Sequence, residues 1–333
     1  NLDSEEGGEY AISIAYLASW QGPVLEKDDP YGDGKTNSNL QAVKHLEEAI
    51  ILKKKDFYAI KNSVFRYGAV ETSIYTMLDG KNISNSYYNS ENCAYYYDGD
   101  EKANHDILIV GWDDNYPKEN FSKEPAADGA FICKNSWGTD FGEDGYFYIS
   151  YYDTIIGDIG VVYSKIGKKD NYDNIYQSDL LGWTGQLGYG SGEAYFANAY
   201  TAKSQETIEA VGFYSIDDNS SYTVYAVPKF NDVKDFSYKI EVASGELRYA
   251  GYHTVNLDNG IDVDAGQKYA MVVYINTPGI VHPIAIEYEA DDRTANFDIE
   301  DGEGYISMSG NAWVSAEKKQ ECNVCLKVFT KDR

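Results

Sequence analysis

The spacing of hydrophobic residues predicts a helix near the start of the chain. Tyr10, Ile14 and Leu17 recur at helical spacing within residues 10–20, and small alanines lie on the adjoining face. Gly22-Pro23 follows and is a typical stop signal for a helix. We therefore expect one amphipathic helix that ends before residue 22.

A second helix is predicted over residues 57–67. Ile60 and Val64 fall on one face of it, four residues apart. Asp56 stands where an N-cap side chain would accept a backbone hydrogen bond, and Gly68 stands just past the expected end. Both ends of this helix are therefore marked by the residue types that commonly cap helices.

After residue 68 the pattern changes to the alternation that is typical of strands. Val70, Thr72 and Ile74 begin an alternating run. Short apolar or aromatic runs then recur between polar turns that contain glycine, at residues 107–112, 129–134 and 145–152. We expect antiparallel strands of one sheet, so the first part of the chain is predicted to be α+β.

A polar, charged stretch at residues 165–174 is the predicted boundary between two domains, residues 1–168 and residues 170–333. Beyond it, no helix longer than a turn or two is expected. Strand-like runs are separated by turn residues and lie at 209–215, 222–227, 252–257, 268–275, 284–288 and 324–330. This pattern predicts an all-β sandwich or jelly roll.

Composition and charge narrow the classes of partner. The formal net charge of −26 argues against nucleic acid, whose phosphates such a surface would repel. No apolar run approaches the roughly 20 residues that a membrane span needs. Four cysteines in 333 residues are too few for a disulfide scaffold. An acidic, Tyr- and Asn-rich, cysteine-poor chain that starts at Asn1 favours a processed or truncated bacterial protein, secreted or at the cell surface.

Three residues have the chemistry to assist a thiol nucleophile. Such a nucleophile needs an imidazole partner, a third group that orients the imidazole, and shielding from water. His105, Asn135 and Trp137 are of the right types, and neighbouring antiparallel strands could bring the first two together. The alternatives are a histidine at the start of a strand, a turn asparagine and a core tryptophan.

A family resemblance favours the chemical interpretation. Residues 104–112 and 133–147, with Asn-His and Lys-Asn-Ser-Trp-Gly-Thr at their centres, resemble the His and Asn boxes of papain-like cysteine peptidases. The resemblance implies that His105 is the general acid/base, Asn135 its orienting partner and Trp137 their hydrophobic cover. It also implies a cysteine endopeptidase that acts on peptides or proteins and requires no cofactor for catalysis.

The resemblance also suggests residues that bind substrate. Gly7 and Gly8 are similar to the Gly-Gly segment of the family, where the backbone pairs with an extended peptide, although a plain turn before a helix is the alternative. Asn104, beside His105, and Met77, after the strand that begins at Val70, are predicted to line the substrate pocket. A core position is the alternative for Met77.

The chain departs from the family pattern where the nucleophile should stand. No Cys or Gln precedes Glu9, so only the strand-rich half of the papain-like domain is retained and the N-terminal helical half is truncated. Cys93 lies on the wrong side for the nucleophile, and Cys133 is expected to be buried packing. We expect the heavy chain of a proteolytically processed enzyme, whose partner light chain carries the catalytic Cys. A truncated gene and a degenerate relative are the alternatives.

The second half resembles the lectin-like β-sandwich domain that follows papain-like peptidase domains in some clostridial surface proteins. The resemblance rests on stretches around Trp183, residues 197–202, 211–214 and 324–330. It allows a structural Ca²⁺, for which carboxylates cluster at Asp217-Asp218-Asn219, Asp262 to Asp264, Asp291-Asp292 and Asp298 to Asp301. Solvated acidic loops are the alternative, and the metal ligands are unknown.

Two further features of the second half leave the function open. Trp183 and Trp313 could stack on a cell-wall glycan, although core positions are the alternative. Cys322 and Cys325 form a lone CxxC, with one thiol predicted to point inward and the other outward; zinc binding or redox activity is not expected. The competing functional hypothesis is a surface adhesin or carbohydrate-binding protein with a non-catalytic peptidase-like scaffold.

Overall fold

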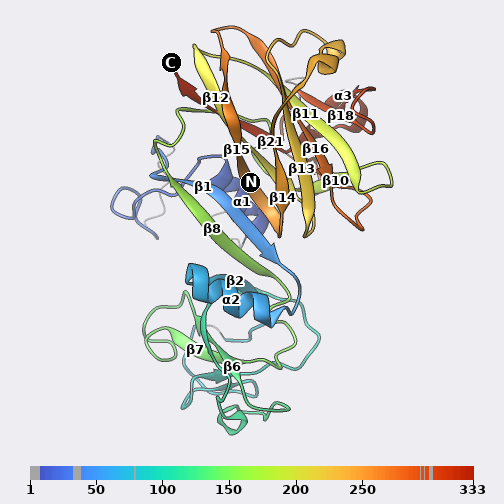
Figure 1. Cartoon of the computed structure of the whole chain (residues 1–333). Coiled ribbons are helices and arrows are strands. Elements are labelled where there is room, and N and C mark those ends of the chain that lie inside the picture. Colours follow the sequence, from blue (N-terminus) through green and yellow to red (C-terminus); the bar gives the residue numbers. More distant parts are fainter. Residues whose placement is uncertain (1–7, 33–38, 79, 293, 296, 300–302) are drawn as a thin grey trace. The chain divides into compact units, whose positions relative to one another are not determined.

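The chain folds into two compact units in a computed structural model. The central unit comprises residues 51–164, and the terminal unit comprises residues 1–50 together with 165–333. The chain passes between them within two strands, β1 (Lys44–Leu52) and β8 (Gly160–Lys168) (Figure 1). The described residues are 8–32, 39–78, 80–292, 294–295, 297–299 and 303–333.

The central unit is a single sheet with one helix. Its strands lie in the order β3-β4-β7-β6-β5-β2-β8, and β4 and β7 are parallel whereas β5, β6 and β7 are antiparallel neighbours. In chain order its elements are α2 (Phe57–Tyr67), β2 (Val70–Ile74), β3 (Tyr88–Asn89), β4 (Ala94–Tyr95), β5 (His105–Asp113), the 3-10 turn η1 (Lys118–Asn120), β6 (Ala130–Lys134) and β7 (Tyr146–Ser150). The predicted α+β arrangement is confirmed.

Helix α2 has the limits that its capping residues predict. The Asp56 side chain accepts a hydrogen bond from the backbone N–H of Ala59 at 2.9 Å, which satisfies one of the free donors at the N-terminus. Gly68 ends the helix with φ of 96°, in the left-handed region that favours glycine. Ile60 and Val64 are buried, so the predicted apolar face packs inward.

One face of the central sheet is apolar because the strands alternate as predicted. Val70, Thr72 and Ile74 are buried in β2, and Ile107 and Ile109 are buried in the paired strand β5. Residues at even spacing in a strand share a face. This register fixes which end of β5 carries His105.

The terminal unit is a β-sandwich that also contains the N-terminal residues. In chain order its remaining elements are α1 (Tyr10–Ala18), β9 (Asn174–Tyr176), β10 (Gly185–Leu187), β11 (Glu193–Thr201), β12 (Glu206–Ser215), β13 (Ser220–Val227), the 3-10 helix η2 (Val233–Tyr238), β14 (Ile240–Leu247), β15 (Ala250–Val263), β16 (Lys268–Asn276), β17 (Ile284–Glu287), β18 (Gly304–Ser307), β19 (Val314–Ser315), α3 (Ala316–Gln320), β20 (Asn323–Val324) and β21 (Leu326–Asp332).

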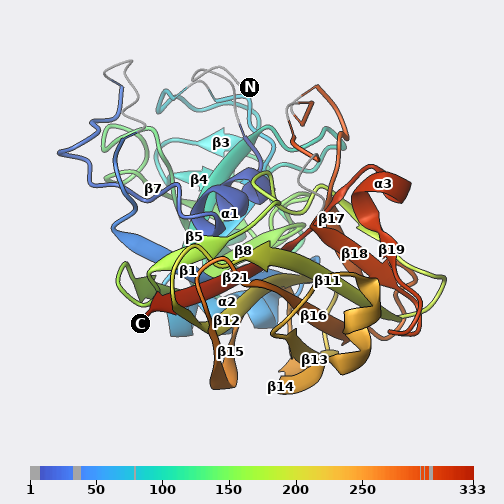
Figure 2. The same ribbon diagram turned by 90° about the horizontal axis from the view of Figure 1, so that it is seen from above.

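Two layers of this unit enclose its main core. One layer has the order β1-β15-β12-β21-β9, and the other is a six-stranded sheet of order β14-β13-β16-β11-β18-β19 (Figure 2). Phe213 of β12 and Phe196 of β11 belong to the same buried cluster, so side chains of both layers meet. A third sheet, β10-β17-β20, has three strands. The predicted all-β sandwich is confirmed.

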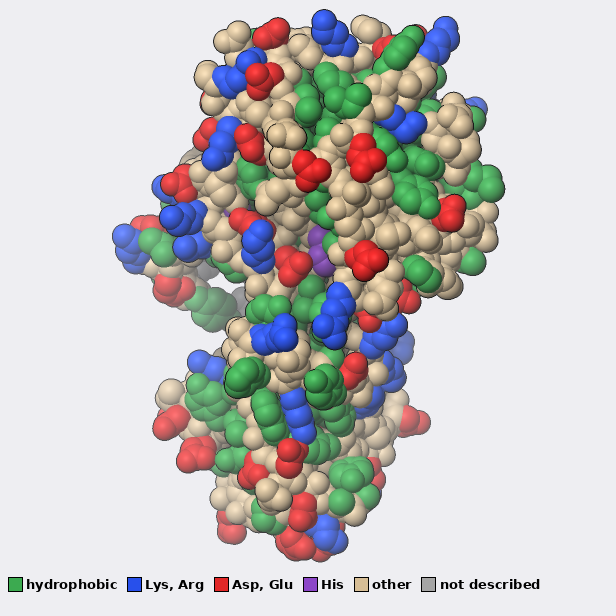
Figure 3. All heavy atoms as spheres, in the orientation of Figure 1, with side chains coloured by type: hydrophobic (Ala, Val, Ile, Leu, Met, Phe, Trp, Pro, Cys, Tyr) green, Lys and Arg blue, Asp and Glu red, His purple; other side chains and the backbone are tan. Residues whose placement is uncertain are grey.

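The grouping of residues into units differs from the predicted domain limits. Residues 8–32 and 39–50 pack with 165–333, and β8 runs through the start of the polar stretch that was predicted to hold the domain boundary. The limits 1–168 and 170–333 stay a prediction. Acidic and basic side chains are interspersed on the face drawn in Figure 3, so the net charge of −26 is not gathered into one acidic area there.

Candidate active site

The strand register of the central unit brings His105 and Asn135 together. His105 opens β5, and Asn135 directly follows β6, the antiparallel neighbour of β5. Because Leu108 pairs with Lys134, the start of β5 and the end of β6 lie at the same edge. His105 Nε2 lies 2.8 Å from Asn135 Oδ1. The predicted contact is therefore present, while the catalytic roles of both residues stay predictions.

The hydrogen bond defines which nitrogen of His105 can exchange a proton. Asn135 Oδ1 also accepts a hydrogen bond from the Ser136 backbone N–H at 2.8 Å, and two donors on one atom identify it as the amide oxygen. Nε2 of His105 must then donate and carry a hydrogen. Nδ1 makes no hydrogen bond to any residue that the structure describes. It is the nitrogen that is available to accept or release a proton.

A short loop holds Asn135 in place. The Asn135 backbone N–H donates to the Gly145 carbonyl at 2.9 Å, and the residue is only 8% exposed. Within this loop Gly142 has φ of 63°, and a Cβ there would lie 2.1 Å from the carbonyl oxygen of Tyr146. Only glycine fits such a close backbone approach. The Asn135 amide nitrogen is buried and has no acceptor among the described residues.

Trp137 covers the imidazole. Its ring stacks on His105 with centroids 4.6 Å apart and planes at 24°. Phe141, which is fully buried, meets Trp137 edge-on at 5.0 Å. An indole above the His105–Asn135 pair limits the access of water and so strengthens the hydrogen bond between them. Phe141 was assigned no role from the sequence, although an aromatic residue four positions after Trp137 in a glycine-rich turn could have signalled it.

The four residues predicted to bind substrate differ in their hydrogen bonds, their exposure and the unit to which they belong. Asn104 uses its side-chain amide to bond both backbone groups of Thr76, at 2.8 and 2.9 Å. Met77, one residue further along, is 64% exposed and is not a core residue. Gly8 is exposed and belongs to the terminal unit, and Gly7 lies outside the described residues. Substrate binding by these four residues stays a prediction.

Neither cysteine of the central unit has the environment of a reactive thiol. Cys133 is fully buried in β6, as predicted, and burial raises its pKa well above the ordinary value. Burial also raises the pKa of Cys93, whose Sγ contacts the Ser90 carbonyl at 3.8 Å. A nucleophilic thiol instead needs a pKa lowered by a neighbouring cation or helix N-terminus.

The two cysteines of the CxxC in the terminal unit also lack the lowered pKa that a nucleophilic thiol needs. Cys322 and Cys325 are 0% and 1% exposed, so the prediction that one thiol points outward is wrong. A short strand, β20, lies between them and is itself buried, which leaves no solvent-facing side for the alternation to use. Burial raises the pKa of Cys322 to about 12. All four cysteines of the chain are free thiols.

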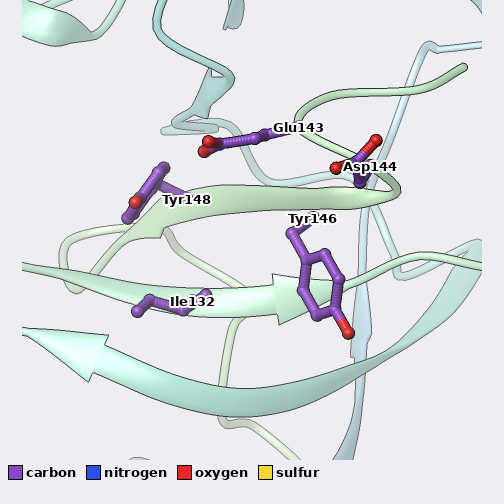
Figure 4. A pocket seen from close by; sticks show the side chains of 5 residues that line it. All are labelled: Ile132, Glu143, Asp144, Tyr146 and Tyr148. Carbon is purple, nitrogen blue, oxygen red and sulfur yellow. The ribbon is translucent and has the colours of Figure 1, made fainter. Parts of the chain in front are cut away.

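A hollow of about 320 Å³ lies at the loop that places Asn135 and Trp137. Ile132, Glu143, Asp144, Tyr146 and Tyr148 line it (Figure 4). Glu143 and Asp144 project from the loop before β7, and the others come from β6 and β7. None of the predicted site residues is among them, so the hollow is a neighbour of the site rather than part of it.

The structure offers limited support for metal or glycan ligands. In the parts of the chain that are described, no three His, Cys, Asp or Glu side chains are grouped to hold a metal. Asp262 and Asp264 instead pair with Arg333, at 3.0 and 3.4 Å. Trp313 stacks on Phe236 at 4.2 Å and is partly buried. A structural Ca²⁺ stays a prediction.

Within the described ranges, every helix is too short or too polar to cross a membrane.

Comparisons with known proteins assign the class of each half of the chain. Residues 4–162 match the family described as papain family cysteine protease, and residues 175–330 match the lectin like domain family. The chain therefore contains a papain-family cysteine protease domain followed by a lectin-like domain, as the sequence motifs predicted.

Solved structures with the same two domains support this assignment. Two solved structures of Cwp84 resemble the whole chain. One is described as the clostridial cysteine protease after propeptide cleavage (28% identity, TM-score 0.87, covering 100% of this chain and 84% of that one). The other contains the cysteine protease and lectin-like domains of Cwp84, a surface layer associated protein of Clostridium difficile (27% identity, TM-score 0.84, 100% and 75% covered).

Curated relatives named as thiol proteases or cathepsins match less than half of the chain. P34 probable thiol protease of Glycine max is 28% identical over 156 residues, and pro-cathepsin H of Mus musculus is 28% identical over 147 residues. These matches cover 44% and 43% of this chain. The matched region spans only 37% and 40% of the length of those two proteins.

Proposed function

We propose that this chain is the His/Asn-bearing part of a bacterial papain-type cysteine endopeptidase. The observation that carries the proposal is the 2.8 Å bond between His105 Nε2 and Asn135 Oδ1, which leaves Nδ1 available under the Trp137 ring. The substrate class is peptides or proteins. Location at the cell surface is supported by the surface-layer association of Cwp84.

In the proposed reaction His105 moves protons and a thiolate attacks. A thiol loses its proton to His105 Nδ1, and the thiolate sulfur bonds to the carbonyl carbon of the substrate. The C–N bond then breaks, and the amine leaves with the proton from His105. Water, deprotonated by His105, attacks the resulting thioester, and the thiolate leaves as the product acid forms. Asn135 keeps the imidazole oriented through both halves of the cycle.

We propose further that the thiol comes from a segment N-terminal to these 333 residues, carried on a separate light chain. The burial of Cys133 and the raised pKa of the Cys93 thiol support this, because neither side chain is a favoured thiolate. The description of one Cwp84 structure as a form after propeptide cleavage supports a processed chain.

The test uses the complete protein, including whatever precedes Asn1. His105→Ala should abolish peptide cleavage, while Cys93→Ala and Cys133→Ala should each retain it. An epoxide inhibitor should label a cysteine outside the 333 residues, and intact-mass analysis should find it on a second polypeptide. Cleavage by His105→Ala at the wild-type rate would falsify the peptidase assignment. A label on Cys93 or Cys133 would refute the external thiol.

The lectin-like match favours a second candidate function, an adhesin that binds cell-wall glycan. It predicts that the native protein binds isolated cell wall and that epoxide labels no cysteine. Epoxide labelling and cleavage by a protein that does not bind cell wall would exclude this second candidate.

A further inference from the structure

Residues 8–32 and 39–50 belong by family to the protease region but fold onto the lectin-like domain. The papain-family match begins at residue 4, whereas the compact unit that contains this segment otherwise consists of residues 165–333. We propose that the lectin-like domain acts as a positioning element of the peptidase. It holds residues 10–50, and through them the thiol-bearing segment that the proposed function, on which this inference rests, places ahead of Asn1.

Trp20 forms the first attachment point. Its ring stacks on His45 of β1 with centroids 3.8 Å apart and planes at 3°, and on Phe329 of β21 at 5.5 Å. Trp20 has φ of 61°, a left-handed conformation that residues other than glycine rarely adopt. Such a conformation persists when the surroundings determine it. Here the lectin-like domain provides part of those surroundings through Phe329.

Polar contacts fix strand β1 at a second point. Glu48 in β1 bonds His253 of β15 at 3.2 Å, and the other ring nitrogen of His253 bonds the Tyr249 carbonyl at 3.0 Å. His253 is only 4% exposed. A buried ring with both nitrogens bonded has a defined orientation, so β1 is held in one register against β15.

Backbone proximity makes the fit specific. Gly251 of β15 has φ of 125°, and a Cβ there would lie 2.1 Å from the Ala49 carbonyl oxygen. At Gly182 a Cβ would lie 2.8 Å from the Ala15 Cβ of α1. The lectin-like domain therefore carries glycines at two places where α1 and β1 approach it closely. A domain tethered only by a flexible linker would not require either contact.

The positioning role predicts different effects for the loss of two aromatic rings, the partly buried Trp20 and the buried Phe230. Trp20→Ala removes the ring that joins the N-terminal segment to Phe329. Phe230→Ala is the matched control, because Phe230 is 2% exposed in a separate cluster of the lectin-like domain with Phe236 and Tyr305. In the complete protein, Trp20→Ala should raise hydrogen exchange of residues 10–50 at least tenfold and slow epoxide labelling of the catalytic thiol at least fivefold.

Phe230→Ala should change neither measurement, and Trp20→Phe should restore most of the labelling rate. Trp20→Phe keeps a ring against His45 and Phe329, and Phe230→Ala reports the effect of a stability loss elsewhere in the lectin-like domain. If Trp20→Ala does not fold, Gly251→Ala replaces it, with Gly266→Ala as control. Gly266 also has positive φ, at 77°, but a Cβ there has nothing within 4 Å.

The outcomes separate this inference from the proposed function. Labelling at the wild-type rate in Trp20→Ala or Gly251→Ala, with residues 10–50 freed in hydrogen exchange, overturns the positioning role alone. Unchanged exchange in these variants overturns the attachment itself. A wild-type protein that neither cleaves nor labels defeats the proposed function, and the exchange comparison still decides whether the lectin-like domain holds the segment.

Discussion

Phe141 meets the Trp137 ring edge-on, with centroids 5.0 Å apart and planes at 90°. Phe141 is itself fully buried and stacks on Tyr88 at 5.5 Å. The ring that covers His105 therefore rests on a fixed aromatic support rather than on solvent. The geometry of the site depends on residues that make no contact with the imidazole.

Phe141→Ala should therefore reduce activity through Trp137. An aromatic pair of this geometry contributes about 0.5–1.5 kcal/mol beyond its buried area, so we expect kcat of the complete protein to fall by up to about tenfold. Phe121→Ala is the control, because Phe121 is equally buried in the central unit but belongs to the cluster with Tyr116. Equal losses of kcat in both variants would refute a specific role for Phe141.

Asn135→Ala should lower kcat more than it raises KM. Without the amide oxygen the imidazole is free to rotate, and its role in proton transfer, which contributes about 10²–10⁴-fold in such enzymes, is impaired. We expect a loss of kcat of roughly tenfold or more. Asn89→Ala removes a half-buried amide that bonds the Asn120 carbonyl at 2.8 Å in the same unit. The prediction fails if Asn135→Ala and Asn89→Ala have the same kcat.

Gly142→Ala should destabilise the loop that carries Asn135 and Trp137. Gly142 and Gly138 both have positive φ, 63° and 79°, but only at Gly142 would a Cβ collide, at 2.1 Å from a backbone oxygen. Left-handed alanine costs about 1–2 kcal/mol at either position, and the collision adds about 1–3 kcal/mol at Gly142. Urea unfolding of both variants measures the difference, and a smaller effect at Gly142 would contradict the loop geometry.

The terminal unit should lose stability as pH rises towards neutrality. Glu287 is 1% exposed, and burial raises its pKa from 4.5 to about 7, although the Asn323 amide and the Leu181 N–H each donate to it at 2.6 Å. The folded protein thus favours the protonated carboxyl. Its contribution is complete below pH 4.5 and is lost as pH rises to about 7, which corresponds to at most about 3 kcal/mol.

Glu287→Gln should flatten this dependence of the free energy of unfolding between pH 4.5 and 7, even if it lowers the stability at every pH. Glu246→Gln, an exposed change on β14, should leave the slope as it is in the wild type. Denaturant unfolding at several pH values provides the measurement. A wild-type stability that increases over this range would show that other groups dominate.

Local signals predicted the elements with strong caps or regular alternation. Helix α2 has both predicted limits because Asp56 and Gly68 act on their own neighbours. The strands that lead from His105 and to Asn135 were found because they are short apolar runs between polar turns that contain glycine. Strand β1 was missed, since two adjacent glutamates and buried residues on both faces hide its period.

The elements and contacts that were not predicted depend on residues that are distant in sequence. Strand β11 was missed because it is rich in alanine and is defined by pairing with β16 along its whole length. The His105–Asn135 bond was anticipated from residue types and a family resemblance, but the support from Phe141 was not. That support arises from the fold of a glycine-rich loop, although the place of Phe141 four residues after Trp137 is a sequence signal for it.

Asn135 and Trp137 lie in one loop, which backbone hydrogen bonds close, among them the bond from the Asn135 N–H to the Gly145 carbonyl. A change that opens this loop would therefore displace both the amide that orients the imidazole and the indole that shields it. A single substitution of that kind would impair both the proton transfer by His105 and the exclusion of water from its hydrogen bond.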